Sequence, residues 1–213
     1  MRYIIMCGGK YGWAKPKQLT EIFGEPVIAR TIRLLRQEGV EDIAISATDR
    51  RFSRLGVPML THRNSFTVKD DEVVSGSWAN AFYPTDEPAC YIMGDVVFSQ
   101  AAIKTIVEAP EAGISFFASS PPFSDLYIKP WAEPFAFKVS DQKRFRAAIR
   151  FVNANVDTGI FWRHPIAWEL WAVINGKDVQ DIDYQSYTAI NDFTCDIDSP
   201  KDVERIEAIL CKL

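Results

Sequence analysis

The sequence predicts a single α/β domain built on a mixed, largely parallel sheet. Short apolar runs alternate with amphipathic helical patterns from end to end, the rhythm of strand-helix-strand units. Neither internal repeats nor low-complexity tracts interrupt this rhythm. The 213 residues are 47% hydrophobic and 24% charged, which is enough apolar chain for one sizeable core. We therefore expect one domain over residues 1–213.

Short apolar runs mark the expected strands. The first run lies almost at the N-terminus, and the run at 90–93 is too short for a helix and ends in Gly94-Asp95. Residues 135–139 alternate between apolar and polar character, as a half-buried strand does. The expected strands cover 3–6, 42–47, 57–60, 90–93, 114–118 and 135–139.

Amphipathic patterns mark the expected helices. Pro26 opens the first, because proline is tolerated in the first turn of a helix. The apolar stripe of this helix lies opposite Arg30, Arg33 and Arg36, which fit a solvated face better than a phosphate clamp. The expected helices cover 26–39, 75–83, 99–108 and 140–150, and two more open at Pro165 and at Ser199-Pro200.

Charge, hydropathy and cysteine usage argue against several classes of protein. The net charge is -4 and no long basic cluster is present, so we expect no nucleic-acid partner. No stretch reaches the length of a membrane span, and the N-terminus lacks a long apolar leader. The cysteines show no metal-ligand or redox spacing, and we expect reduced core residues of a cytoplasmic protein. They are Cys7, Cys90, Cys195 and Cys211.

A loop rich in glycine and lysine follows the first expected strand. Glycines let backbone N–H groups approach a triphosphate closely, and lysines supply the opposing charge. The spacing is neither that of a Walker loop nor that of a dinucleotide fingerprint. A surface loop with solvated lysines explains the glycine content equally well. The candidate nucleotide-binding residues are Cys7, Gly8, Gly9, Lys10, Lys15 and Lys17.

Acidic residues lie at two places where they can face a ligand. Asp95 ends a central apolar strand, and ligands of open α/β sheets bind outside the carboxyl ends of strands. Asp196 and Asp198 precede the last helix, where a capping box explains Ser199 but not the two acids. An acid that ends a strand is also often only a turn residue. Brought together, the carboxylates of Asp95 and Asp198 would hold Mg²⁺, with phosphate oxygens completing its shell.

These patterns together resemble a known group of enzymes. The group is the nucleotidyltransferases with a GT-A-like, Rossmann-type fold, including the MobA-like, sugar-1-phosphate and methylerythritol cytidylyl enzymes. The resemblance covers roughly 1–108 and 190–213, with its motifs in the right order. It implies a three-layer α/β/α sandwich with a mostly parallel mixed sheet. Its motifs are Cys7-Gly8-Gly9, Pro16-Lys17, Gly24-Glu25-Pro26, Tyr91-Ile92-Met93-Gly94-Asp95 and Asp196-Ile197-Asp198-Ser199-Pro200-Lys201-Asp202.

The resemblance implies an activity and a division of the chain. A nucleotidyl group would pass from a nucleoside triphosphate to a small phosphorylated acceptor, a sugar or polyol phosphate, with release of pyrophosphate. Residues 1–118 would bind the nucleotide, 119–189 the acceptor, and 190–213 would supply the second metal motif and the C-terminal helix. A homodimer is one possible assembly. No nucleic-acid or membrane partner is implied.

The resemblance also implies roles for single residues. The glycine loop would cradle the triphosphate, and Lys17 would neutralise charge at the α-phosphate. Asp95 and Asp198 would ligate Mg²⁺ and, with Lys17, form the catalytic set. The loop lacks the arginine that usually precedes the Pro-Lys pair, and Lys10 or Lys15 would replace it as a point charge.

Residues 119–189 match no pattern of that group, and alternatives remain open there. Arg163 and His164 precede the start of a helix, where they would bind an acceptor phosphate. The alternative is that Arg163 is only a surface residue and that the neighbouring tryptophans belong to the core. The role of Glu133 is not predicted. His62 follows an expected strand and would lie near the nucleotide base, although a lone histidine usually has no such role. Two rival functions are a GT-A glycosyltransferase that uses a nucleotide sugar through 196–198, and a non-catalytic nucleotide-binding module.

Overall fold

A seven-stranded sheet forms the centre of the molecule. The computed structural model describes residues 1–8, 16–62, 67–69, 72–119, 132–182 and 186–213. The strand order is β12-β10-β11-β8-β1-β4-β5, and β11 runs antiparallel to both of its neighbours, whereas the other pairings are parallel. The strands are β1 (Arg2–Met6), β4 (Ile43–Ser46), β5 (Met59–Leu60), β8 (Ala89–Met93), β10 (Ile114–Ala118), β11 (Pro134–Val139) and β12 (Thr188–Ala189).

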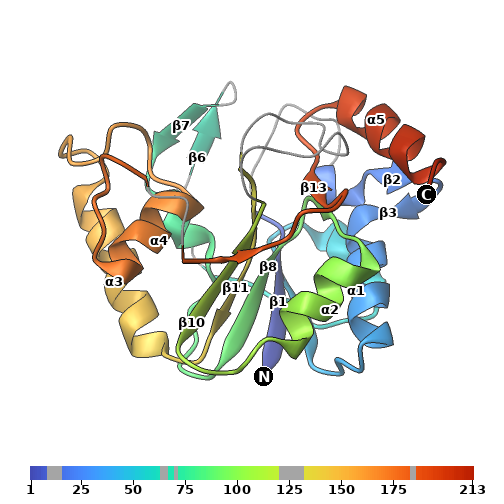
Figure 1. Ribbon diagram of the computed structural model, residues 1–213, viewed down its shortest axis with the longest axis horizontal. Helices are drawn as coiled ribbons and strands as arrows, with labels where there is room; N and C mark the ends of the chain where they lie inside the picture. The colour runs from blue at the N-terminus through green and yellow to red at the C-terminus, as the bar shows by residue number, and fades with distance from the viewer. Residues whose placement is uncertain (9–15, 63–66, 70–71, 120–131, 183–185) are drawn as a thin grey trace.

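Helices cover both faces of this sheet, and a further helix lies beyond its carboxyl edge. In Figure 1, α1 and α2 lie on one side of the strands and α3 and α4 on the other, while α5 lies at the upper right, beyond the carboxyl ends of the strands. The predicted three-layer α/β/α class is therefore confirmed. The helices are α1 (Val27–Gln37), α2 (Gln100–Glu108), α3 (Gln142–Asn155), α4 (Ala167–Asn175) and α5 (Pro200–Leu210).

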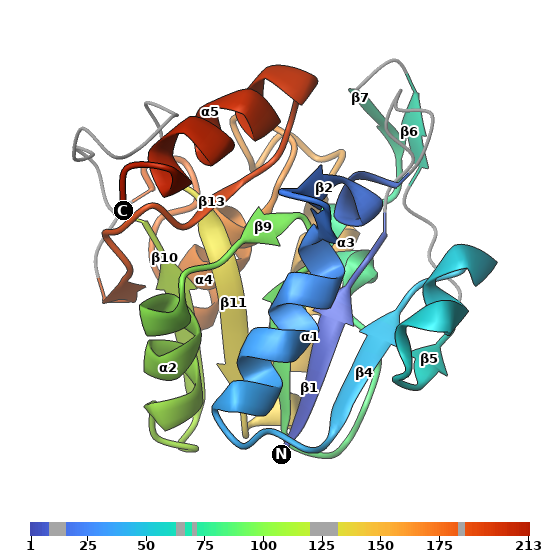
Figure 2. The ribbon, with the colours of Figure 1, turned by 90° about the vertical axis from the view of Figure 1, so that its right-hand side faces the viewer.

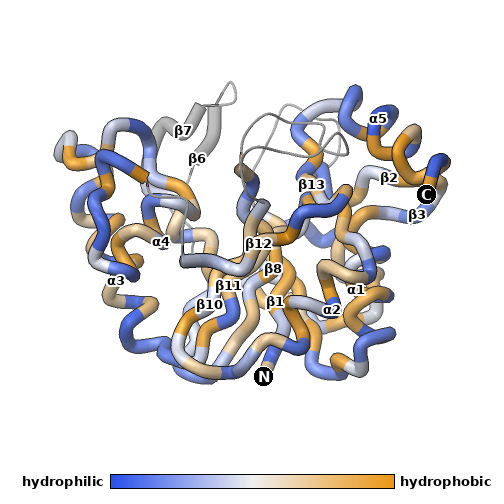
Figure 3. The backbone as a smooth tube through the Cα atoms, viewed as in Figure 1, coloured by the Kyte–Doolittle hydropathy of each residue, from blue (hydrophilic) through white to orange (hydrophobic). Residues whose placement is uncertain are grey.

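Aromatic side chains join the sheet to α3 and α4. Phe145 of α3 stacks on Tyr91 of β8 with ring centroids 5.6 Å apart, and Trp168 of α4 meets Phe116 of β10 edge-on at 5.0 Å. Such pairs contribute beyond the area that they bury. Figure 3 colours the chain by hydropathy: hydrophobic residues lie on the central strands and hydrophilic residues mainly on the outer turns of the helices.

Short elements at the carboxyl edge were not predicted. Within the described ranges, three two-stranded ladders lie outside the main sheet, and three 3₁₀ helices connect larger elements. Their strands are too short to show a periodic hydropathy pattern. The ladders pair β2 (Glu21–Ile22) with β3 (Glu25–Pro26), β6 (Thr67–Lys69) with β7 (Glu72–Ser75), and β9 (Val96–Val97) with β13 (Cys195–Asp196). The 3₁₀ helices are η1 (Lys17–Leu19), η2 (Arg50–Leu55) and η3 (Trp78–Ala81).

The prediction of a helix over 75–83 is wrong. Strand β7 ends at Ser75, and Gly76 adopts a left-handed backbone conformation with φ of 72°. Only the short η3 follows, capped by the Ser77 hydroxyl, which accepts a hydrogen bond from the Ala79 N–H. The other predicted helices exist with shifted ends: α1 begins one residue after Pro26, and α3 continues to Asn155.

The cysteines agree in part with the prediction. All four are free thiols, and Cys7, Cys90 and Cys195 are buried, as expected of core residues. Cys211 is exposed beyond the end of α5, so the expectation of a core position is wrong for this residue. Among the helices of the described ranges, none is both long enough and apolar enough to cross a membrane.

Candidate active site

Three of the predicted site residues meet at the carboxyl edge of the sheet. Lys17 opens η1, directly after the loop that follows β1, and its side chain is only 4% exposed. The Lys17 Nζ lies 2.8 Å from Asp198 Oδ1 and 3.5 Å from Asp95 Oδ2. The two carboxylates, about a hundred positions apart in the sequence, thus share one ammonium group. Lys17, Asp95 and Asp198 form the ionic cluster of the site.

The close approach of β8 to β1 positions Asp95. The Gly94 N–H donates a hydrogen bond of 3.0 Å to the Met6 carbonyl at the end of β1. A Cβ atom at Gly94 would lie 2.4 Å from that carbonyl oxygen and 2.8 Å from the Cys7 sulfur. Only glycine fits this contact without a shift of the backbone. Glycine before Asp95 therefore fixes where the carboxylate leaves the sheet.

A short ladder brings Asp198 to Asp95. Strand β9 follows Asp95 and β13 precedes Asp198, and the two strands pair antiparallel, side by side in Figure 2. The ladder is extended by the Ile197 N–H, which donates to the Asp95 carbonyl at 3.0 Å. The ladder explains the convergence of two distant acids, because each of them is adjacent to one of its strands.

A buried carboxylate holds the turn that presents Asp198. Asp202, 5% exposed in the first turn of α5, accepts hydrogen bonds from the backbone N–H groups of Asp198 and Ser199 at 2.9 and 2.7 Å. The Ser199 hydroxyl also donates to it at 3.1 Å. The predicted capping box is therefore present, and it orients Asp198 as well as starting the helix.

Glu133 connects the main sheet to the same segment. Its carboxylate accepts a hydrogen bond of 2.9 Å from the Asp196 N–H, and its own N–H donates to the Ser119 hydroxyl at 2.8 Å. Its side chain is 2% exposed. This role of Glu133 was not predicted, because the contact joins residues 63 positions apart.

The ionic cluster lines a cavity of about 370 Å³. Its wall is partly apolar, with Trp78, Ile166 and Pro134 among the lining residues. Its charged lining residues come from all three predicted parts of the chain: Lys17, Asp95, Glu133, Arg163, Asp196 and Asp198. Four acids thus face two bases, which suits a site that also takes a cation.

The predicted nucleotide loop is described only at its two ends. Cys7 and Gly8 follow β1, whereas Gly9, Lys10 and Lys15 lie outside the described residues. The Cys7 thiol is buried, and burial raises its pKa well above the usual range, with a further contribution from the Asp95 charge. The thiol therefore stays protonated and is unsuited to act as a nucleophile.

The two histidines differ in position. His62 is held between the Ser46 hydroxyl at 3.4 Å and the Asn80 carbonyl at 2.9 Å, and it lines a separate cavity beside Tyr83. Burial lowers the pKa of His164, against the opposing charge of Asp157. Of the pair Arg163 and His164, only Arg163 is among the residues that line the cavity of the ionic cluster.

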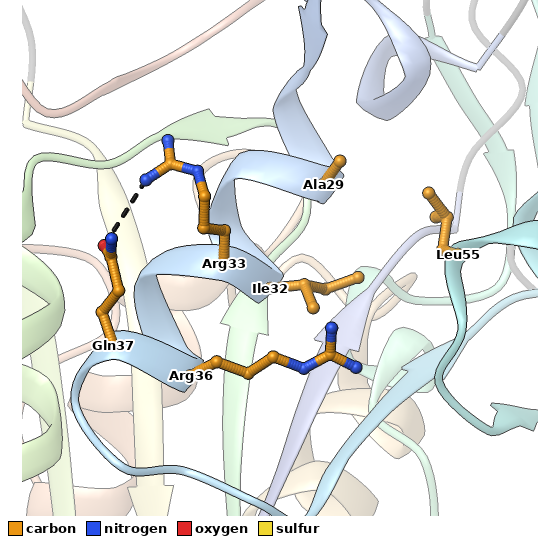
Figure 4. Close-up of a pocket in the computed structure, with 6 residues that line it drawn as sticks. All are labelled: Ala29, Ile32, Arg33, Arg36, Gln37 and Leu55. Carbon is orange, nitrogen blue, oxygen red and sulfur yellow. Dashed lines mark hydrogen bonds between the residues drawn. The ribbon is translucent and has the colours of Figure 1, made fainter.

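A second cavity of about 370 Å³ lies on the outer side of α1, and none of its lining residues belongs to the ionic cluster (Figure 4). Arg33 is paired with Glu25 at 2.7 Å and donates to Gln37 at 3.4 Å, and Arg36 donates to the Gly56 carbonyl at 3.3 Å. The predicted solvated face is confirmed for Arg33 and Arg36, which are exposed and also have these protein partners.

The donor set of the ionic cluster has the chemistry that Mg²⁺ prefers. Asp95 and Asp198 offer hard carboxylate oxygens, and the Lys17 ammonium beside both shows that a cation fits between them. Within the described ranges, no group of three or more histidine, cysteine, aspartate or glutamate side chains is arranged to hold a metal ion. A metal at this place would need further oxygen ligands from a substrate or water.

Comparisons with known proteins identify the fold. No protein-family model matches the sequence, and no match is found among curated proteins. The structure is similar to that of the inositol-1-phosphate CTP transferase from T. maritima, with a TM-score of 0.52, 19% sequence identity, and coverage of 98% of this chain and 95% of that chain.

A second solved structure with the same fold is a protein from Bacillus anthracis in complex with sucrose, described as a glucose-1-phosphate thymidylyltransferase. Its TM-score is 0.60, with 15% identity, and the match covers 100% of this chain and 96% of that chain. The overall fold is thus common to all three proteins. This chain has the fold of the sugar-phosphate nucleotidyltransferases.

Proposed function

We propose that this chain transfers a nucleotidyl group from a nucleoside triphosphate to a small phosphorylated acceptor. The observation that carries the proposal is the ionic cluster of Lys17, Asp95 and Asp198 at the carboxyl edge of the sheet. The proteins that share the fold are named for inositol 1-phosphate and glucose 1-phosphate, which are acceptors of this class. An acceptor phosphate oxygen attacks the α-phosphorus, the bond between the α-phosphorus and the bridging oxygen breaks, and pyrophosphate leaves.

Each member of the cluster has a role that follows from its charge. Asp95 and Asp198 would hold Mg²⁺, which when bound neutralises negative charge on the phosphates. Lys17 exchanges its carboxylate partners for a phosphate oxygen, so that its charge stays compensated while the substrate binds. Gly8 and the loop that follows would contribute backbone N–H groups, whereas the Cys7 N–H already donates to the Ser46 carbonyl at 2.9 Å. The protein supplies positioning and charge, and forms no covalent intermediate.

The cavity joins the two regions expected to bind the two substrates. Residues 1–118 supply Lys17 and Asp95 and are proposed to bind the nucleotide. Residues 119–189 supply Glu133 and Arg163 and are proposed to bind the acceptor, while 190–213 supply Asp198. The loop residues Gly9, Lys10 and Lys15 are proposed to complete the triphosphate site.

Release of pyrophosphate from a panel of nucleoside triphosphates and phosphate esters, with and without Mg²⁺, tests the proposal. Lys17→Met should lower the rate roughly 10- to 100-fold, since a charge-assisted contact contributes about 1.5–3 kcal/mol. Lys104→Met is the matched control, because Lys104 is an exposed lysine of α2 paired with Glu108. Equal rates for the two variants would remove Lys17 from the reaction.

The same measurement separates the rival functions. A glycosyltransferase would release a nucleoside diphosphate from a nucleotide sugar, and a binding module would release nothing. Thermal shift with each triphosphate shows which base is bound, because a ligand that binds only the folded state raises its stability. A chain that binds no triphosphate and releases no pyrophosphate would contradict the proposal.

A further inference from the structure

Arg163 is a basic residue of the cavity that lies outside the ionic cluster. Of the lining residues in the described ranges, only Lys17 and Arg163 are basic. Lys17 is paired with two aspartates, whereas Arg163 has a different partner, Glu169. An anionic group that enters the cavity beside the cluster therefore meets Arg163.

The protein fixes the orientation of Arg163 with a buried acid. Glu169 of α4 is 0% exposed, and its Oε1 lies 2.6 Å from Arg163 Nε. Its Oε2 accepts the Ile166 N–H at 2.9 Å, at the start of α4. The Trp162 ring centroid lies 4.9 Å from the guanidinium carbon. A buried carboxylate is costly to keep in a protein, and here it orients one guanidinium group.

The donors of Arg163 are only partly used by the protein. Glu169 engages Nε, while Nη2 is buried and has no hydrogen-bond partner in the part of the chain that the structure describes. The side chain as a whole is 32% exposed and lines the cavity, so a ligand there can contact it. Buried donors are normally satisfied, and a shift of the Arg163 side chain toward a ligand in the cavity would give Nη2 the partner that it lacks.

We propose that Arg163 binds the phosphate group of the acceptor, and that the acceptor is a phosphate monoester. A planar guanidinium matches two phosphate oxygens at once, which a lysine cannot do. Binding at Arg163 holds the acceptor phosphate within the cavity that also contains the ionic cluster. Glu169 is the positioning residue that orients Arg163. This inference rests on the proposed function, because it assigns the second substrate of that reaction.

Direct binding measured by calorimetry tests the inference without turnover. The probes are inorganic phosphate, glucose 1-phosphate and myo-inositol 1-phosphate, and the nucleoside triphosphate with Mg²⁺ is the reference ligand. Arg163→Met should weaken binding of the esters roughly 10- to 100-fold while triphosphate affinity stays unchanged. Arg163→Lys should restore only part of the affinity. Arg33→Met is the matched control, since Arg33 pairs with Glu25 away from this cavity. This variant should bind the esters and the triphosphate as the wild type does.

A double-mutant cycle tests the role of Glu169. Glu169→Gln should weaken ester binding, but in combination with Arg163→Met it should add nothing further, because Glu169 acts through Arg163. Additive losses would overturn that role. Arg163→Lys serves if Arg163→Met does not fold.

The outcomes for the acceptor site also differ from those for the proposed function. Unchanged ester affinity, equal losses of ester and triphosphate affinity, or no ester binding by the wild-type chain would overturn the inference. If ester binding depends on Arg163 but the chain releases no pyrophosphate, the phosphate site is supported and the proposed reaction is refuted.

Discussion

Substitution of Gly94 by alanine should disturb both the stability and the active site of this protein. The new Cβ atom would lie 2.4 Å from the Met6 carbonyl oxygen and 2.8 Å from the Cys7 sulfur. The tightest contacts that real Cβ atoms make are 3.0–3.4 Å long. To lengthen the contact with the carbonyl oxygen to that range, β8 and β1 must separate by 0.6–1.0 Å at this point. The movement also strains the 3.0 Å hydrogen bond from the Gly94 N–H to Met6.

The expected loss of stability follows from these two effects. Overpacking of this size costs typically 1–3 kcal/mol, and a weakened hydrogen bond about 1 kcal/mol, so the sum is roughly 2–4 kcal/mol. For a chain of this length the melting temperature should fall by roughly 4–16 °C. Asp95 moves with its neighbour, and a shift approaching 1 Å should lower the transfer rate ~100-fold. Thermal unfolding and pyrophosphate release measure the two effects.

Gly39→Ala supplies the matched control for this experiment. Gly39 has φ of 79°, and a Cβ atom there would meet nothing within 4 Å. Its substitution therefore tests only the strain of a left-handed backbone, which costs about 1 kcal/mol. If Gly94→Ala is no less stable than Gly39→Ala, or if its transfer rate equals that of the wild type, the close contact does not position Asp95.

Three further substitutions test other parts of the structure. Asp202→Ala removes the acceptor of the Asp198 and Ser199 N–H groups. The free energy of unfolding in urea should fall by roughly 1–3 kcal/mol, and the transfer rate should also fall. An unchanged rate would show that the capping turn does not orient Asp198. His164 has a lowered folded pKa, so the unfolded chain binds its proton more readily and stability should fall as the pH drops below about 6.5. His164→Gln should flatten that part of the pH dependence, and an identical curve would assign it to other groups. Lys138 is 2% exposed and donates to three carbonyls at the end of α2. Lys138→Met should therefore destabilise the chain by roughly 1–3 kcal/mol and speed hydrogen exchange in that helix. Unaltered exchange would contradict this role.

The sequence by itself determined the fold class and the larger elements. Apolar runs such as 90–93 predicted β8, and the proline and apolar stripe near Pro26 predicted α1, because hydropathy period and chain-stiffening residues act over a few positions. The order of the motifs placed Lys17, Asp95 and Asp198 in one site before their distances were known. The helix predicted over 75–83 failed because β7 runs to Ser75, Gly76 adopts a left-handed conformation, and only the short η3 follows before the chain becomes extended at Phe82.

Only the tertiary structure decided how the site is assembled. The β9–β13 ladder, with two residues in each strand, carries no periodic signal, yet it brings the segments of Asp95 and Asp198 together. The hydrogen bond from Asp196 to Glu133 and the cavity that unites Arg163 with Lys17 also join distant parts of the chain. Such contacts depend on where packed elements end in space, and the free energy that selects them comes from the burial of the whole core rather than from any local pattern.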